Sequence, residues 1–310
     1  VLALAACSHS APPEASKAAP AAGSTAAPAA HAPAAAEAKA KPAAFEPPPE
    51  SAIPQGPFCD MVRLGREIFV DTGVAAKEYV GNGLRCSNCH LDAGRLANSA
   101  PLRGAYVAYP AYRAKNGHVN TLGERLQGCF KYSMNGKAPP LDSKEMVALE
   151  TYAFWMAKGA PTGEKLPGAG YPKKGFKPPQ PPDFARGEQV FKQHCALCHS
   201  DDGQGKQVAG RYAFPPLWGP DSFNWGAGMG QLDNAAAFIK ANMPLSQGGT
   251  LTDQDAWDVA MYMDAHERPQ DPRYKGDLAA TRKAYHDTPM SLYGTTVNGH
   301  LLGSAPATRK

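Results

Sequence analysis

The chain has 310 residues and a formal net charge of only +4. A charge this small, with no basic stripe along any segment, excludes the usual signature of a nucleic-acid-binding protein. No apolar run is long enough to span a bilayer. Residues 8–56 are almost entirely Ala and Pro, so we expect them to stay unfolded, which leaves room for two domains and their connectors.

The first seven residues, Val-Leu-Ala-Leu-Ala-Ala-Cys, resemble the end of a bacterial lipoprotein signal. This resemblance predicts that Cys7 carries diacylglycerol and anchors the protein to a membrane, with the Ala/Pro stretch as its tether. Ser8 follows the cysteine in place of Asp, which weakly favours the outer membrane. The alternative is a secretory signal cleaved near Ala6, which would leave Cys7 an ordinary residue.

The first domain is predicted over residues 57–160. A helix from Asp60 to Val70 carries its apolar residues on one face. A second helix is predicted over 142–158, because Asp142 and Glu145 have the spacing of a capping box. Its expected buried stripe consists of Met146, Leu149, Ala153 and Met156.

Residues 161–182, rich in Gly, Pro and Lys, form the predicted linker to a second domain over 183–268. Helices are expected there over 184–194, 232–242 and 252–267. Each half of the chain therefore shows the same order of a helix, a Cys-x-x-Cys-His motif, a long loop and a terminal helix. Residues 269–310 show little periodicity, and we expect them to wrap the surface as a C-terminal extension.

Two Cys-x-x-Cys-His motifs, at 86–90 and 195–199, predict two covalently bound haem c groups. Two thiols on one helical turn can bond both haem vinyl groups, and the adjacent imidazole can bind the iron. The attachment residues are then Cys86, Cys89, Cys195 and Cys198, and the proximal ligands His90 and His199. The predicted fold is mainly α, with two cytochrome c-type helical domains in tandem. A zinc site made of two Cys-x-x-Cys pairs is the alternative, but it leaves both histidines unexplained.

The distal iron ligands differ between the halves. In the second, Met243 precedes a proline between two predicted helices and is the expected ligand, with Met229 as the alternative. The first half has no Met-Pro at the matching place, but its loop over 122–140 holds two sulfur side chains, Cys129 and Met134. Four cations accompany this loop: Arg113, Lys115, Arg125 and Lys131.

At these residues the chain is similar to the dihaem c-type cytochromes of the thiosulfate dehydrogenase family, which interconvert thiosulfate and tetrathionate. The resemblance extends from residue 57 to about 272. The matching stretches are Cys-His-Leu-Asp-Ala-Gly-Arg at 89–95, Pro-Ala-Tyr-Arg at 110–113, 125–136 with Gly-Cys-Phe and Ser-Met-Asn-Gly, Pro-Pro-Leu-Trp-Gly-Pro-Asp-Ser-Phe-Asn at 215–224, and Asn-Met-Pro at 242–244.

The resemblance implies that Cys129 is the distal ligand of the first haem and bonds transiently to a substrate sulfur. Arg125 and Ser133 match positions near the substrate, and Arg113 is our third candidate, since guanidinium groups suit the oxygens of a small dianion. The implied reaction couples two thiosulfates to tetrathionate, or runs in reverse. Electrons would pass from the first haem to the second, and then to a soluble c-type cytochrome or similar acceptor.

For the second haem, Asn242 stands where some relatives of the family carry Lys beside the distal Met, so plain His/Met ligation is expected. Because thioether attachment takes place outside the cytoplasm in bacteria, the predicted location is the periplasm, with a lipid anchor.

Two other interpretations remain. In a dihaem electron carrier without its own substrate, Met134 would bind the first iron. Cys129 would then be a small buried residue or form a disulfide with Cys59. In a membrane-tethered subunit of a larger complex, the tether and the C-terminal extension would allow the protein to join its partners.

Overall fold

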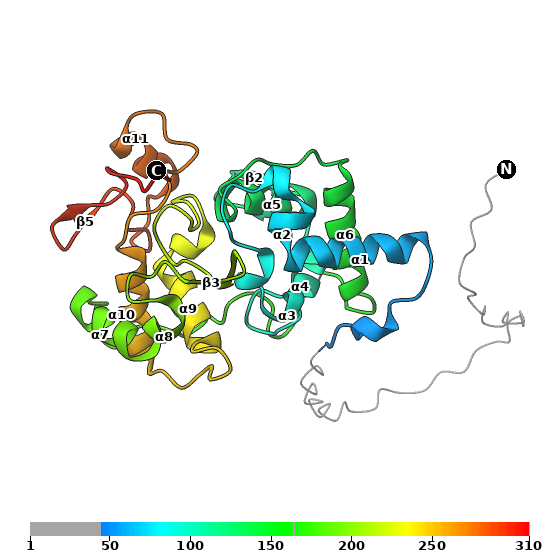
Figure 1. Cartoon of the computed structure of the whole chain (residues 1–310), viewed down its shortest axis with the longest axis horizontal. Helices are drawn as coiled ribbons and strands as arrows, with labels where there is room; N and C mark the ends of the chain where they lie inside the picture. Colours follow the sequence, from blue (N-terminus) through cyan, green and yellow to red (C-terminus); the bar gives the residue numbers. More distant parts are fainter. Residues whose placement is uncertain (1–44, 164, 310) are drawn as a thin grey trace, which may run out of the picture. The chain divides into compact units, whose positions relative to one another are not determined.

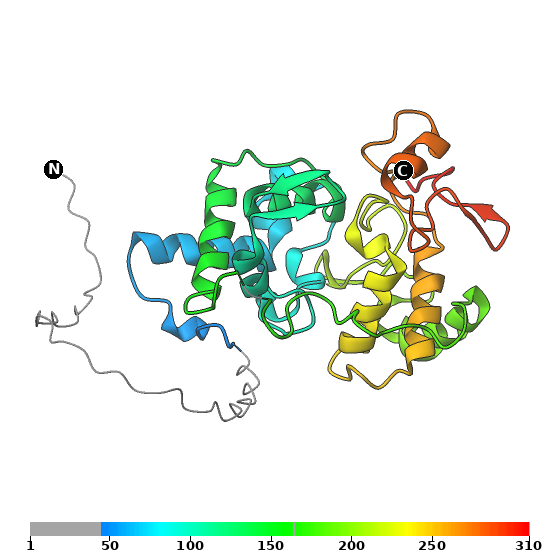
Figure 2. The same ribbon diagram turned by 180° about the vertical axis from the view of Figure 1, so that it is seen from behind.

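The computed structural model describes residues 45–163 and 165–309, so Cys7 and most of the predicted tether lie outside it. Within these ranges the chain is mainly helical, with three small antiparallel sheets (Figures 1 and 2). No helix in the described ranges is long and apolar enough to cross a bilayer.

The α-helices are α1 (Pro57–Val70), α2 (Thr72–Ala75), α3 (Leu91–Gly94), α4 (Leu102–Ala108), α5 (Leu122–Gly128), α6 (Lys144–Met156), α7 (Phe184–His194), α8 (Ala196–His199), α9 (Leu232–Asn242), α10 (Asp253–Asp264) and α11 (Leu278–Tyr285). Single 3-10 turns are η1 (Glu50–Ala52), η2 (Lys77–Tyr79), η3 (Cys86–Asn88) and η5 (Gly228–Gly230), and η4 (Cys129–Ser133) is a π-helix. The paired strands are β1 (Ala111–Arg113) with β2 (His118–Asn120), β3 (Lys206–Val208) with β4 (Arg211–Phe214), and β5 (Thr296–Val297) with β6 (His300–Leu301).

The first domain is organised around the contact between α1 and α6 (Figure 1). Gly65 lies at this contact, where a Cβ atom would come within 2.0 Å of the Ala148 carbonyl oxygen. The predicted stripe on α6 is confirmed, because Met146, Leu149, Ala153 and Met156 are all buried. The helix begins later than predicted, because Ser143 rather than Asp142 accepts the capping hydrogen bond, from the Met146 amide at 3.3 Å.

The second domain repeats this packing between α7 and α10. A Cβ atom at Gly187 would lie 2.0 Å from the Asp258 carbonyl oxygen, so the two helices also meet here through a glycine. The predicted bounds of α7 and α9 are confirmed. Thr252 caps α10 in a capping box with Asp255, and the helix ends at Asp264, before the predicted end at residue 267.

Two segments are more structured than predicted. Residues 45–56 lie on the first domain, where Arg95 donates to the carbonyl oxygens of Pro47 (3.0 Å) and Pro48 (2.8 Å). A proline-rich backbone keeps its carbonyl oxygens free to accept hydrogen bonds, and arginine side chains can donate to them. Such contacts need no apolar residues, so the sequence pattern does not reveal them. The C-terminal extension contains α11 and a strand pair, and it buries the side chains of Tyr293 and His286.

Candidate active site

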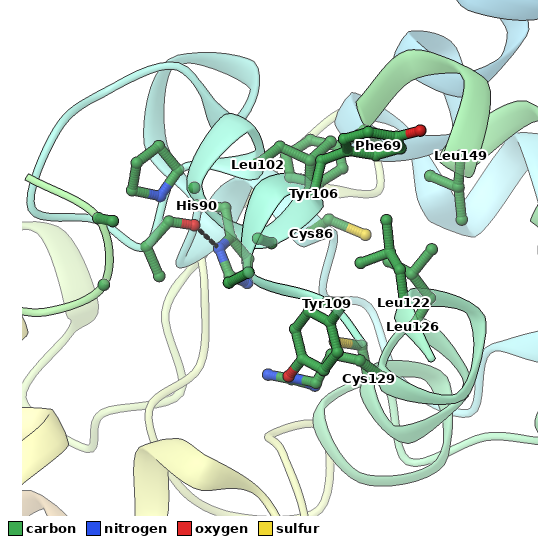
Figure 3. Close-up of a pocket in the computed structure, with 18 of the residues that line it drawn as sticks. Phe69, Cys86, His90, Leu102, Tyr106, Tyr109, Leu122, Leu126, Cys129 and Leu149 are labelled. Carbon is green, nitrogen blue, oxygen red and sulfur yellow. Dashed lines mark hydrogen bonds between the residues drawn. The ribbon is translucent and has the colours of Figure 1, made fainter. Parts of the chain in front are cut away.

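A cavity of about 1420 Å³ lies in the first domain and is lined by all the residues of its Cys-x-x-Cys-His motif except Ser87. His90 is fixed by a 2.7 Å hydrogen bond between its Nδ1 and the Ala100 carbonyl oxygen (Figure 3). Nδ1 therefore carries the proton, and Nε2 keeps its lone pair for a metal. Burial lowers the pKa of His90, which keeps the imidazole in the neutral form that a metal requires.

The wall of this cavity fits a haem group. Cys86 and Cys89 both line it, and neither forms a disulfide, so both sulfurs are available as thioethers. Much of the remaining lining is apolar, as Figure 3 shows for Phe69, Leu102, Leu122, Leu126 and Leu149. An apolar wall with an oriented imidazole and two free thiols is what covalent haem attachment needs.

The second domain has a cavity of about 320 Å³ with the same components. His199 Nδ1 donates to the Pro215 carbonyl oxygen at 2.9 Å, which again leaves Nε2 for the iron. Met243 lines this cavity, whereas Met229, its rival as distal ligand, lies in the wall of both cavities. In residues 45–163 and 165–309, no group of three or more His, Cys, Asp or Glu side chains is placed to hold a metal ion.

Three of the four predicted catalytic residues meet in the first cavity. Arg125, Cys129 and Ser133 all line it, and Arg125 Nη1 donates to Cys129 Sγ at 2.9 Å. The charge on the Cys129 sulfur raises the pKa of Arg125, which outweighs the effect of burial. Cys129 begins the π-helix η4 and shares the cavity with His90, which comes from a different element (Figure 3). The arrangement places a cation, a free thiol and an oriented imidazole around one space.

The structure also bears on the rival assignments for this loop. Met134 lines the cavity too, but it belongs to the buried core of the first domain. Cys59 and Cys129 are both free, so the disulfide considered from the sequence is not formed. Arg113 lies at the end of β1 and is not part of the cavity wall. Its pKa is lowered by burial and then by the charge of Arg125.

Two asparagines that sequence reasoning missed hold the Cys129 loop in place. Asn224 is fully buried, and its amide donates to the carbonyl oxygen of Lys131 (3.0 Å) and to Oδ1 of Asn135 (2.9 Å). Asn82 donates to the Ser133 carbonyl oxygen at 2.9 Å and to that of Ser222 at 3.0 Å. Asn224 ends one of the stretches that carry the family resemblance, but the sequence alone did not indicate this role.

Comparison with known proteins agrees with this geometry. Residues 76–162 match the SoxA/TsdA cytochrome c domain, and residues 182–263 match the cbb3-type cytochrome c oxidase subunit III family. The chain is 61% identical over 265 residues to the thiosulfate dehydrogenase of Thiomonas intermedia (strain K12), which covers 86% of this chain and 84% of the relative. The chain belongs to the thiosulfate dehydrogenase family.

Other members of the family support the same assignment. The thiosulfate dehydrogenase of Stutzerimonas stutzeri (strain A1501) is 55% identical over 264 residues, covering 84% of this chain and 85% of the relative. A solved structure described as thiosulfate dehydrogenase (TsdBA) from Marichromatium purpuratum aligns with a TM-score of 0.81 and 49% identity. The alignment covers 85% of this chain but 58% of that longer chain. The predictions of two tandem cytochrome c domains and two covalent haem c groups are thereby confirmed.

Proposed function

We propose that this protein couples two thiosulfates to tetrathionate with release of two electrons, or catalyses the reverse. Relatives at 55–61% identity are named thiosulfate dehydrogenases. The single observation that carries the proposal is the 2.9 Å contact from Arg125 to the Cys129 sulfur, in the cavity that also contains His90. A plain electron carrier has no need for a sulfur nucleophile paired with a cation at its iron site.

We choose the haem-binding residues from among those that line the two cavities. The first haem would be attached at Cys86 and Cys89 with His90 and Cys129 as iron ligands, and the second at Cys195 and Cys198 with His199 and Met243. When bound, the two haems supply two one-electron acceptors, one at the reaction site and one that relays electrons outward. We assign the domain of the first haem to residues 57–160, extended by residues 45–56. The domain of the second haem covers residues 183–268, and residues 161–182 form the linker.

The protein's own side chains account for the sulfur chemistry. The Cys129 thiolate forms a bond to the terminal sulfur of one thiosulfate, and this oxidation releases two electrons. The terminal sulfur of a second thiosulfate then attacks that same substrate sulfur. The new bond completes tetrathionate, and the bond to Cys129 breaks to restore its thiolate. Arg125 would neutralise the thiolate and the substrate oxygens, and the hydroxyl of Ser133, which also lines the cavity, would donate to those oxygens.

The electrons leave to an external acceptor, which we propose to be a soluble c-type cytochrome. Haem c is attached outside the cytoplasm in bacteria, which supports a periplasmic location. A lipid on Cys7 would hold the protein at a membrane, with the outer membrane weakly favoured. Mass analysis of the N-terminal peptide tests the anchor, because a diacylglyceryl group on Cys7 adds a hydrophobic mass that an ordinary cysteine lacks.

The test is an assay of the purified holoprotein with thiosulfate and an artificial acceptor, together with the reverse assay with tetrathionate and a reductant. We expect turnover in at least one direction, and failure of both would refute the proposal. Cys129→Ala should abolish turnover while both haems stay attached. Cys59→Ala is the matched control, because Cys59 is also a free thiol but lies outside the cavity wall.

Electron paramagnetic resonance separates this proposal from an electron carrier. A ferric haem with thiolate ligation has a narrow spread of g values, and this signal should disappear in Cys129→Ala. A wild-type spectrum with only His/Met signals would assign the first iron to Met134 and support the carrier instead.

A further inference from the structure

The C-terminal extension reaches the first domain beside the catalytic loop. Both matched cytochrome c domains end before it, the second at residue 263. Arg273, in this extension, lies with its guanidinium carbon 5.0 Å from the centre of the Tyr132 ring. Tyr132 belongs to the same π-helix, η4, as Cys129. A segment outside both family domains therefore adds a cation next to the loop that carries the proposed nucleophile.

The orientation of Arg273 is fixed by a buried hydrogen-bond network. Its Nε and Nη2 donate to the two carboxylate oxygens of Asp271 at 2.9 and 2.6 Å, and the Asp271 side chain is fully buried. His286 Nε2 lies 2.9 Å from the same carboxylate, and its Nδ1 lies 2.9 Å from the Ser291 hydroxyl. The guanidinium also packs 4.0 Å from the centre of the Tyr285 ring. The edge formed by Nε and Nη2 is occupied by Asp271, which holds the guanidinium in one orientation and leaves Nη1 to donate to a further oxyanion.

Lys115 approaches Tyr132 as well. Although the residue as a whole is exposed, its amine turns inward, where it donates to the Gly226 carbonyl oxygen and lies 4.2 Å from the centre of the Tyr132 ring. Burial of this amine, followed by the charge of Arg273, lowers the pKa of Lys115 to about 7. Burial is the larger cause, and the positive charges of Arg273, Arg125 and Arg113 lower this pKa further.

Of the cations in this region, Arg273 is paired with the carboxylate of Asp271, whereas the others have no such partner in the part of the chain that the structure describes. Across residues 45–163 and 165–309, no Asp or Glu forms an ion pair with Arg113, Lys115 or Arg125. The carboxylate of Asp271 pairs with Arg273 and is also in contact with His286 Nε2. Cation–π contacts with one ring offset only part of the repulsion between such cations. A bound dianion would offset much more of it, because each cation would then face an opposite charge.

We propose that Arg273 and Lys115 form an outer anion site beside Tyr132 that holds the second thiosulfate while the first is at Cys129. This inference rests on the proposed function, which requires two dianions to meet at one sulfur atom. Arg125 would bind the inner thiosulfate, which is the one at Cys129. The C-terminal extension would complete the outer site. The extension is then a specificity element rather than a passive cover.

The test compares Arg273→Met with Lys275→Met in the holoprotein. Both variants remove one positive charge from the same segment, but Lys275 is exposed and forms no ion pair or side-chain hydrogen bond within the described ranges. We expect Arg273→Met to raise KM for thiosulfate about tenfold, with kcat within about twofold of the wild type, since loss of one charged contact typically has that effect. Lys275→Met should leave both constants unchanged.

Lys115→Met provides a second variant, because Lys115 lies on the first domain and its loss leaves the Asp271 network intact. It should also raise KM, and the combined Arg273→Met and Lys115→Met variant should raise KM by less than the product of the single effects, because both residues bind one anion. An unchanged KM in both single variants, or fully multiplicative effects, would overturn the outer site while the activity itself stands. A wild-type protein without activity toward thiosulfate and tetrathionate would instead overturn the proposed function.

Discussion

The fully buried Asn224 offers a direct test of how the second domain positions the Cys129 loop. Its side chain makes three hydrogen bonds, to the Lys131 carbonyl oxygen (3.0 Å), to Asn135 Oδ1 (2.9 Å) and from the Gly226 amide (3.0 Å). Asn224→Ala removes all three and leaves their partners without replacements. At about 1 kcal/mol for each net hydrogen bond, the loop should lose about 3 kcal/mol of local stability, or roughly 100-fold in its opening equilibrium.

Hydrogen exchange of the holoprotein measures this opening. The amides of Met134 and Gly136 are bonded to the carbonyl oxygens of Cys129 (3.0 Å) and Phe130 (2.9 Å), so they report on the loop itself. Exchange over residues 129–136 should accelerate about 100-fold, whereas α6 should be unaffected. Asn234→Ala, which removes one exposed hydrogen bond to Gly228 (2.7 Å), is the control. Unchanged exchange in Asn224→Ala would refute the role assigned to this residue, and equal acceleration everywhere would show global destabilisation instead.

Three further outcomes are expected. The pKa of Lys115 is lowered to about 7, so KM for thiosulfate should rise as the amine deprotonates between about pH 6 and 8, and Lys115→Arg should remove this rise, as initial-rate assays would show. Burial lowers the pKa of His286 although Asp271 opposes this, so the folded protein binds fewer protons than the unfolded chain just below about pH 6.5. The melting temperature should therefore fall as pH decreases from about 7 to 5, and His286→Gln should flatten this dependence; equal slopes would contradict it. Finally, a thiol reagent should label Cys59 in the denatured, unreduced holoprotein, and protection until reduction would show that a disulfide forms after all.

Local patterns predicted the helices well because their signals lie within one or two turns. The bounds of α7 and α9 and the buried stripe of α6 follow from apolar periodicity alone. The two haem motifs are equally local, since both thiols and the imidazole occupy five consecutive positions. The cap of α6 was misplaced by one residue because Asp142 and Ser143 are both good capping residues, and only backbone geometry selects between them.

Contacts between distant residues could not be predicted in this way. Asn224 meets Lys131 across 93 positions of sequence, and neither residue has a periodic or compositional signal that names the other. His286 is a polar residue in a segment with little periodicity, so the sequence does not mark it as buried. It is nevertheless buried against Asp271, because the extension folds back on itself. Arg113 was chosen for its charge, and the structure places it beside the cavity rather than in its wall. Charge and proximity in sequence thus identified the region but not its internal arrangement.

The glycine at the main helix contact of each domain bears on the evolutionary origin of the two domains. Gly65 and Gly187 occupy the same place in the two domains, each with a carbonyl oxygen 2.0 Å from where a side chain would begin, and each beside a tyrosine, Tyr152 or Tyr262. Two halves that share so specific a contact are most simply explained as copies of one ancestral gene. Because the contact lies away from the loops, mutation could alter the loop of one copy without loss of the shared scaffold. Differences between the halves, such as Cys129 in one and Met243 in the other, would then record divergence after duplication.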